Sequence, residues 1–292
     1  MDSAILSLLG AFLLSIMGLF VFIWSMRKGL LVENPRAASV IFAPGELGKV
    51  DDPAIHGNQG KPQDRLPGAE PLPGETEHVA NPDELRHRIE ADHSTAFPVF
   101  MFIAFACFWL LLGSAAGLTA SLKLHMPDWM VGEAWQTFGR IRTVHLTAVL
   151  YGWITNAALG VIIWLLPRLL RTHLVGAMWV MLGGALINTG IASAIGAIGS
   201  GWTDGMEYLE IPWQIGIFIV AGFICIIGPV LYTLVNRKVE SLYVSVWYMV
   251  AALLWIALLF IIGKLPGVHT GVQQATTNWW YGHNVLGLWF TP

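Results

Sequence analysis

Residues 138–156 read FGRIRTVHLTAVLYGWITN, and this stretch decides the fold. Arg140 and Arg142 lead into His145, which opens a run of apolar and small residues long enough to cross a bilayer. Ionisable groups inside membranes are costly, and they usually mark a cofactor, an ion path or a counter-ion. We therefore predict a membrane helix here and treat His145 as a candidate cofactor ligand.

The composition is that of a membrane protein. Hydrophobic residues make up 55% of the chain and charged residues only 12%, whereas soluble domains carry about 25% charged residues. The net charge of −3 says little about partners, and we expect the lipid bilayer and no nucleic acid. Cys107 and Cys225 both lie in apolar segments, which indicates packing and neither a disulfide framework nor a thiolate metal site.

The apolar runs predict an all-α polytopic membrane protein with six full transmembrane helices and the start of a seventh. The first run, 6–24, lacks a basic leader and a small-residue cleavage site, so we interpret it as a retained anchor. Residues 34–93 are rich in proline, glycine and both signs of charge, which predicts a solvated, disordered linker. Further spans are expected near residues 98–118, 144–166, 175–198, 213–235 and 242–262, with a seventh beginning near Asn278.

Lysine and arginine predict the orientation in the membrane. Placing the linker and the loops near residues 170 and 237 on one side collects twelve of the sixteen basic residues there. That side is therefore predicted to be cytoplasmic, with the N-terminus periplasmic. His145, the acidic turn at 204–210 and His283 then all fall near the external face.

A helical wheel shows which residues share the helix face of His145. At helical spacing Arg142, Gly152 and Asn156 return to its face. Small residues beside the imidazole would leave room for a flat macrocycle, and an arginine could pair with its propionates. The alternative is a histidine hydrogen-bonded between helices, and the pattern alone does not separate the two interpretations.

Two other clusters share the predicted external face. TNWWYGHNVLGLWF, 277–290, surrounds His283 with aromatic rings, and imidazole is a common ligand of copper, iron or zinc. A single histidine cannot hold a metal, so an interfacial aromatic belt explains this pattern more simply. GWTDGMEYLEIPW, 201–213, carries Asp204, Glu207 and Glu210, whose carboxylates could bind Ca²⁺. Their spacing does not follow an EF-hand, so a solvated turn is the simpler interpretation.

Taken together, these stretches resemble the catalytic subunit of cbb-type (C-family) haem–copper oxygen reductases. FGRIRTVHLTAVLYGW is similar to that family's second transmembrane helix. The resemblance implies that His145 is an axial ligand of low-spin haem b, with Arg140 and Arg142 beside the haem propionates. NWWYGHN is similar to the sixth-helix motif, which implies His283 as a copper ligand. GMEYLEIPW resembles an external turn that helps hold calcium, with Glu207 the best match and Glu210 the next.

The resemblance also implies a domain organisation. Residues 95–292 correspond to the N-terminal half of the oxidase subunit I bundle, and residues 53–94 form a disordered cytoplasmic linker. In residues 1–52, GLFVFIWSMRKGLL followed by PRAASVIF resembles the small single-helix maturation protein of the same oxidases. We therefore expect a C-terminally truncated chain, with the other copper histidines and the ligands of a second, high-spin haem b on the missing remainder of subunit I.

The implied function is that of a respiratory terminal oxidase, a cytochrome c oxidase of the bacterial inner membrane. Electrons from c-type cytochrome subunits would pass through haem b to a haem–copper centre, where oxygen is reduced to water with proton uptake. One alternative is a nitric oxide reductase, whose corresponding helix carries a glutamate shortly after its histidine, whereas NVLGLWFTP follows His283. The other is a non-catalytic membrane assembly factor or fragment, since part of the ligand set is missing.

Overall fold

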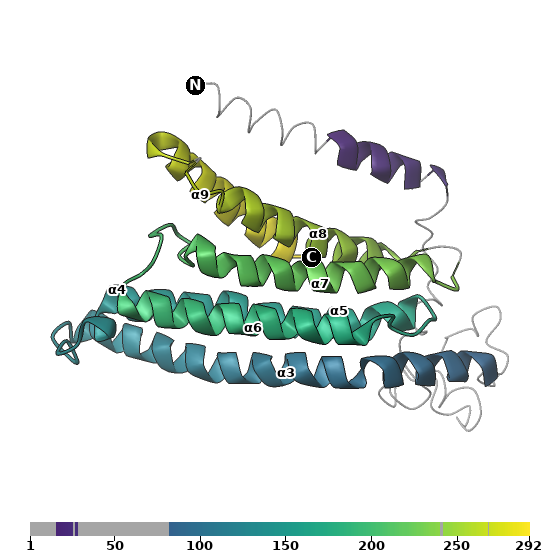
Figure 1. The fold of residues 1–292 in the computed structure, drawn as a ribbon, viewed down its shortest axis with the longest axis horizontal. Helices are drawn as coiled ribbons and strands as arrows, with labels where there is room; N and C mark the ends of the chain where they lie inside the picture. Colours follow the sequence, from purple (N-terminus) through teal and green to yellow (C-terminus); the bar gives the residue numbers. More distant parts are fainter. Residues whose placement is uncertain (1–15, 26, 29–81, 240–241, 268) are drawn as a thin grey trace, which may run out of the picture.

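The computed structural model describes residues 16–25, 27–28, 82–239, 242–267 and 269–292. Long helices lie side by side along the longest axis of the molecule (Figure 1). Five of them are long and apolar enough to cross a membrane, and the described part of the chain contains no β-strand. The prediction of an all-α polytopic membrane protein is therefore confirmed.

The helices follow one another in an up-and-down order. One spanning helix is built from three segments in direct succession, with a π-helical segment, η4, in the middle. A second π-helical segment, η5, ends the described chain. The bounds are α3 (Pro82–His125), η3 (Ala134–Gln136), α4 (Phe138–Thr147), η4 (Ala148–Ile154), α5 (Thr155–Leu169), α6 (Ala177–Ser200), α7 (Trp213–Val235), α8 (Val244–Gly263), α9 (Gly271–Val285) and η5 (Leu286–Phe290).

The bundle has one end that collects the residues of interest. The loops that follow α3, α6 and α8 all lie at the end where α4 begins, on the left in Figure 1. We call this the site end. His145, both arginines, the acidic turn and His283 lie at or near it, because α4 and α9 begin there and the turn leads into α7.

Glycines permit a close contact between α6 and α7. On α6, a Cβ added at Gly183 would lie 2.5 Å from the carbonyl oxygen of Gly222 on α7, and a Cβ at Gly222 would lie 2.6 Å from the Gly183 oxygen. Any side chain at either position would force the two backbones apart. In a membrane, where helices associate through close packing, such a contact stabilises the bundle.

A buried polar cluster joins α3, α5 and α6. Trp109 Nε1 donates to Asn188 Oδ1 at 2.7 Å, and the amides of Asn188 and Asn156 exchange hydrogen bonds of 2.8 and 3.1 Å. Their amide nitrogens also reach the carbonyls of Gly184 and Gly152, at 2.8 and 2.7 Å. Since buried polar groups are costly when unpaired, this pairing fixes the register of the three helices.

Three helices start earlier than the sequence predicted. α4 begins at Phe138 and α9 at Gly271, because polar residues at the site end continue the helices beyond their apolar parts. α3 begins at Pro82, so residues 82–94 of the expected linker are helical. Of the first expected span, 6–24, the structure describes residues 16–24, within the helix Ile16–Ser25; the rest of that span and residues 34–81 of the linker lie outside the described residues.

Candidate functional site

His145 lies in the last turn of α4 and faces α3. Its Nδ1 is 2.8 Å from the carbonyl oxygen of Gly113. A carbonyl only accepts hydrogen bonds, so Nδ1 carries a proton and donates it, and the acceptor lone pair of the neutral imidazole is then on Nε2. A hydrogen bond from Nδ1–H to a main-chain carbonyl orients a histidine for metal binding through Nε2.

A glycine on α3 makes room for the ring. A Cβ added at Gly117 would lie 2.7 Å from both Cε1 and Nδ1 of His145. Gly113 and Gly117 are spaced four residues apart in GSAAG, so one face of α3 receives the imidazole. The hydrogen bond to Gly113 and this slot fit an axial ligand of a haem iron.

The space expected beside Gly152 is filled. A Cβ at Gly152 would lie 2.6 Å from Cγ of Trp109, and the Asn156 amide is bonded to Gly152 O and to Asn188. The expectation that Gly152 and Asn156 leave room for a macrocycle is therefore wrong. Gly152 faces α3, as His145 does, and Asn156 contacts α6, which the sequence pattern does not specify.

Both arginines have partners at the site end. Arg142 donates to the Glu207 carboxylate at 2.7 Å, and Arg140 Nη1 donates to the carbonyl of Gly199 at 2.9 Å. Gly201 ends α6 with φ of 97°, where a Cβ would lie 2.6 Å from Arg140 Nη2. Arg140 therefore caps the carboxyl end of α6, while the charge of Arg142 is paired with a carboxylate.

The turn between α6 and α7 is tied to α8 by a lysine. Lys264 is buried, donates to Asp204 Oδ2 at 2.8 Å and also bonds the carbonyl of Leu209. Burial lowers the pKa of Lys264, and the adjacent Asp204 carboxylate partly offsets this effect. Burial raises the pKa of Glu210, whose Oε1 is buried without a hydrogen-bond partner.

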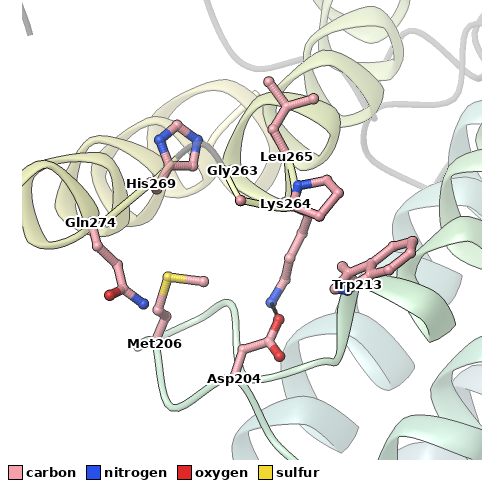
Figure 2. A pocket seen from close by; sticks show the side chains of 10 residues that line it. Asp204, Met206, Trp213, Gly263, Lys264, Leu265, His269 and Gln274 are labelled. Carbon is pink, nitrogen blue, oxygen red and sulfur yellow. Dashed lines mark hydrogen bonds and ion pairs between the residues drawn. The ribbon is translucent and has the colours of Figure 1, made fainter. Parts of the chain in front are cut away.

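A pocket of about 240 Å³ opens beside this ion pair (Figure 2). Met206, His269 and Gln274 line it together with Lys264 and Asp204. The His269 ring bonds Ile262 O at 2.8 Å and the Thr277 hydroxyl at 3.3 Å, so it braces the connection between α8 and α9. This pocket was not predicted from the sequence, because its lining comes from three separate segments.

α9 reaches both the turn and η4. The Asn278 side chain bonds the main chain of Glu207, and the Tyr281 hydroxyl lies 2.7 Å from that of Tyr151. Tyr281 is buried, whereas His283, two residues on, is exposed.

The metal ligands expected from the sequence stay predictions: His283 for copper, and Glu207 and Glu210 for calcium. Among the described residues, no group of three or more histidine, cysteine or acidic side chains could hold a metal ion.

Residues 98–292 match the family model of cytochrome c and quinol oxidase polypeptide I. The chain belongs to this family. Its curated relatives include a "cytochrome c oxidase subunit 1 homolog" of Agrobacterium tumefaciens, 29% identical over 197 residues, which are 63% of this chain and 36% of the relative. A "Cbb3-type cytochrome c oxidase subunit" of Stutzerimonas stutzeri is 28% identical over 213 residues, 68% of this chain and 44% of the relative.

The chain therefore spans less than half the length of these oxidase relatives. A third relative, "cytochrome c oxidase subunit 1" of Rhodobacter capsulatus, is 28% identical over 201 residues and is covered to 37%. Membership of the oxidase family implies haem and copper as cofactors, and it agrees with a multi-pass membrane protein.

Sequence reasoning missed several residues of this candidate site. Gly113 and Gly117 were signalled by their four-residue spacing, which is typical of close helix contacts. No sequence pattern marks Asn278 or Lys264, because each forms hydrogen bonds with a turn that lies more than 50 residues away in the sequence. Their roles depend on how α8 and α9 fold back over the α6–α7 turn.

Proposed function

We propose that this chain is the haem-bearing N-terminal part of the catalytic subunit of a cbb-type respiratory terminal oxidase. Electrons from cytochrome c would reach a low-spin haem b on His145 and then a high-spin haem b and copper, where oxygen is reduced to water with proton uptake. The observation that carries the proposal is His145 itself, whose Nδ1–H is held by Gly113 O and whose Nε2 is free to ligate.

The chain's own residues would prepare the site in three ways. Gly113 fixes the tautomer of His145, and Gly117 leaves space for the ring. Arg142, three residues before the ligand, would place a positive charge near the haem propionates. When bound, haem b supplies one-electron transfer, with a potential that the axial imidazole and nearby charges adjust.

His283 would supply one ligand of the copper ion, and the remaining ligands would come from the portion of the subunit that corresponds to the rest of the longer relatives. Glu207 and Glu210 would contribute oxygen ligands to a calcium ion at the same end. Residues 1–52 would form a maturation-protein-like anchor, joined to the bundle by a cytoplasmic linker. The subunit would act with c-type cytochrome subunits in a bacterial inner membrane.

Replacement of the ligand tests the proposal. The full membrane-bound protein should show the optical spectrum of a low-spin haem b, and His145→Ala should abolish that spectrum. His125→Ala is the matched control, because His125 is exposed at the end of α3 and should leave the spectrum unchanged. A His145→Ala variant that keeps the wild-type spectrum would contradict the assignment of His145 as the haem ligand.

The substrate is tested separately. The residues after His283, NVLGLWFTP, contain no carboxylate of the kind expected in a nitric oxide reductase. Membranes containing the protein should therefore consume oxygen with reduced cytochrome c as donor. Consumption of nitric oxide in place of oxygen would favour the reductase.

A further inference from the structure

Asn278 makes a two-point contact with the turn between α6 and α7. The Glu207 N–H donates to Asn278 Oδ1 at 3.1 Å, and Asn278 Nδ2 donates to the Glu207 carbonyl at 2.6 Å. Both main-chain groups of Glu207 are therefore held by one planar amide. Asparagine suits this role because a single short side chain presents both a donor and an acceptor.

The clamped residue is the partner of Arg142. The Glu207 carboxylate accepts from Arg142 Nη2 at 2.7 Å. The two side chains are 32% and 43% exposed, so the attraction between them is screened by solvent and does not by itself fix their geometry. The position of the Glu207 backbone decides where the carboxylate can reach, and Asn278 holds that backbone.

Arg142 lies one turn before His145 on the same side of α4. An uncompensated positive charge at this position would favour the reduced form of a haem bound to His145, because reduction lowers the net charge of the iron centre. A carboxylate held against the guanidinium cancels much of this effect. With haem bound to His145, the Arg142–Glu207 pair would therefore influence the reduction potential of the iron.

We propose that Asn278 is a positioning residue that sets the reduction potential of the haem on His145 by holding Glu207 against Arg142. This inference rests on the proposed function, since it requires His145 to bind haem. Asn278 lies on α9 five residues before His283, so the same helix carries the proposed copper ligand and controls the charge at the haem.

Redox titration of the low-spin haem in the full membrane-bound protein tests this inference. Asn278→Leu keeps the shape of the side chain and removes both hydrogen bonds. At a fixed ambient potential it should raise the ratio of ferrous to ferric haem about threefold, and Glu207→Gln should raise it about fivefold. The double variant should match Glu207→Gln alone, because both changes act through one carboxylate.

Thr276→Ala is the matched control. Its hydroxyl bonds Val272 O within α9, so its loss should leave the haem ratio unchanged. If the Asn278→Leu protein does not assemble, Asn278→Ser can be used in its place, because serine keeps one small hydrogen-bonding group. The ratio of ferrous to ferric haem should again increase.

The inference is overturned if the Asn278 variant binds haem and keeps the wild-type ratio of ferrous to ferric haem. It is also overturned if, in the double variant, the effect of the Asn278 change adds fully to that of Glu207→Gln. Either result leaves the proposed function intact. The proposed function fails on a different measurement, namely a haem spectrum that survives in His145→Ala.

Discussion

At the scale of single residues, Gly117 has no room for added volume beside the His145 ring. Its missing Cβ would lie 2.7 Å from the His145 ring. Gly117→Ala should push the imidazole away from Gly113 O, lower the free energy of unfolding by roughly 1–3 kcal/mol and weaken the low-spin haem spectrum. Thermal unfolding and optical spectra of the purified protein measure both effects.

Gly196→Ala is the control for this change. Gly196 also lies within a helix, α6, and a Cβ there meets nothing within 4 Å. This variant should be as stable as the wild type or slightly more so, because alanine is the better helix former. Equal behaviour of the two alanine variants would contradict the assignment of Gly117 as the histidine slot.

The ionisation of Lys264 should make the free energy of unfolding depend on pH in the alkaline range. Burial lowers the pKa of Lys264 below its ordinary value of 10.5, against the opposing effect of Asp204. Between the lowered pKa and 10.5, the unfolded chain binds more protons than the folded one. The free energy of unfolding therefore rises with pH across this window, and that stabilisation is lost again as pH falls through the folded-state pKa.

Lys264→Met should remove this rise. It should also lower stability at neutral pH by about 1–3 kcal/mol, because Asp204 and the Leu209 carbonyl lose their cationic donor. Melting temperatures measured from neutral pH to 10.5 would check both points. The same upward slope in wild type and variant would show that another group causes the pH dependence.

At the scale of elements, the early start of α3 depends on a contact with α5. Arg168 is buried and donates two hydrogen bonds to Asp92, at 2.7 and 2.8 Å, and it stacks over Trp164 at 4.6 Å. Ser94 also accepts a hydrogen bond from the Leu174 N–H at 2.8 Å. A charged stretch that resembles a linker in the sequence is therefore held as helix by partners on other segments.

Asp92→Ala should loosen the first turns of α3. Loss of the paired hydrogen bonds should reduce local stability by about 1–2 kcal/mol, which hydrogen–deuterium exchange at residues 86–95 would detect as roughly tenfold faster exchange. Arg86→Ala is the matched control, since its bond to Glu90 is an exposed contact within one helix and should contribute about 0.3–0.5 kcal/mol. Exchange that stays slow in Asp92→Ala would contradict this role.

At the scale of the whole molecule, the distribution of basic residues predicts that the site end faces the periplasm. This orientation can be measured with single cysteines, after Cys107 and Cys225 are replaced by serine. Asp128 and Asn236 are exposed at opposite ends of the bundle. In intact spheroplasts, an impermeant maleimide should label Asp128→Cys and leave Asn236→Cys unlabelled. The reverse pattern would place the site end in the cytoplasm.

Across the whole chain, the apolar pattern predicts where the helices lie but not where they begin and end. The five spanning helices were predicted near their observed positions because the cost of exposing a polar backbone to lipid makes long apolar runs helical. The helix ends were missed by several residues at α3, α4 and α9, where contacts with other segments, such as Asp92 with Arg168, continue a helix beyond its apolar part.

The amino-acid sequence was enough to predict the membrane helices and to mark His145, Arg140 and Arg142, because hydrophobic length and costly buried charges are local properties of a chain. The folded structure was needed to show that Gly113 orients the imidazole and that Trp109 fills the space beside Gly152. These contacts join residues far apart in the chain. Their geometry follows from how helices pack, which no single segment encodes.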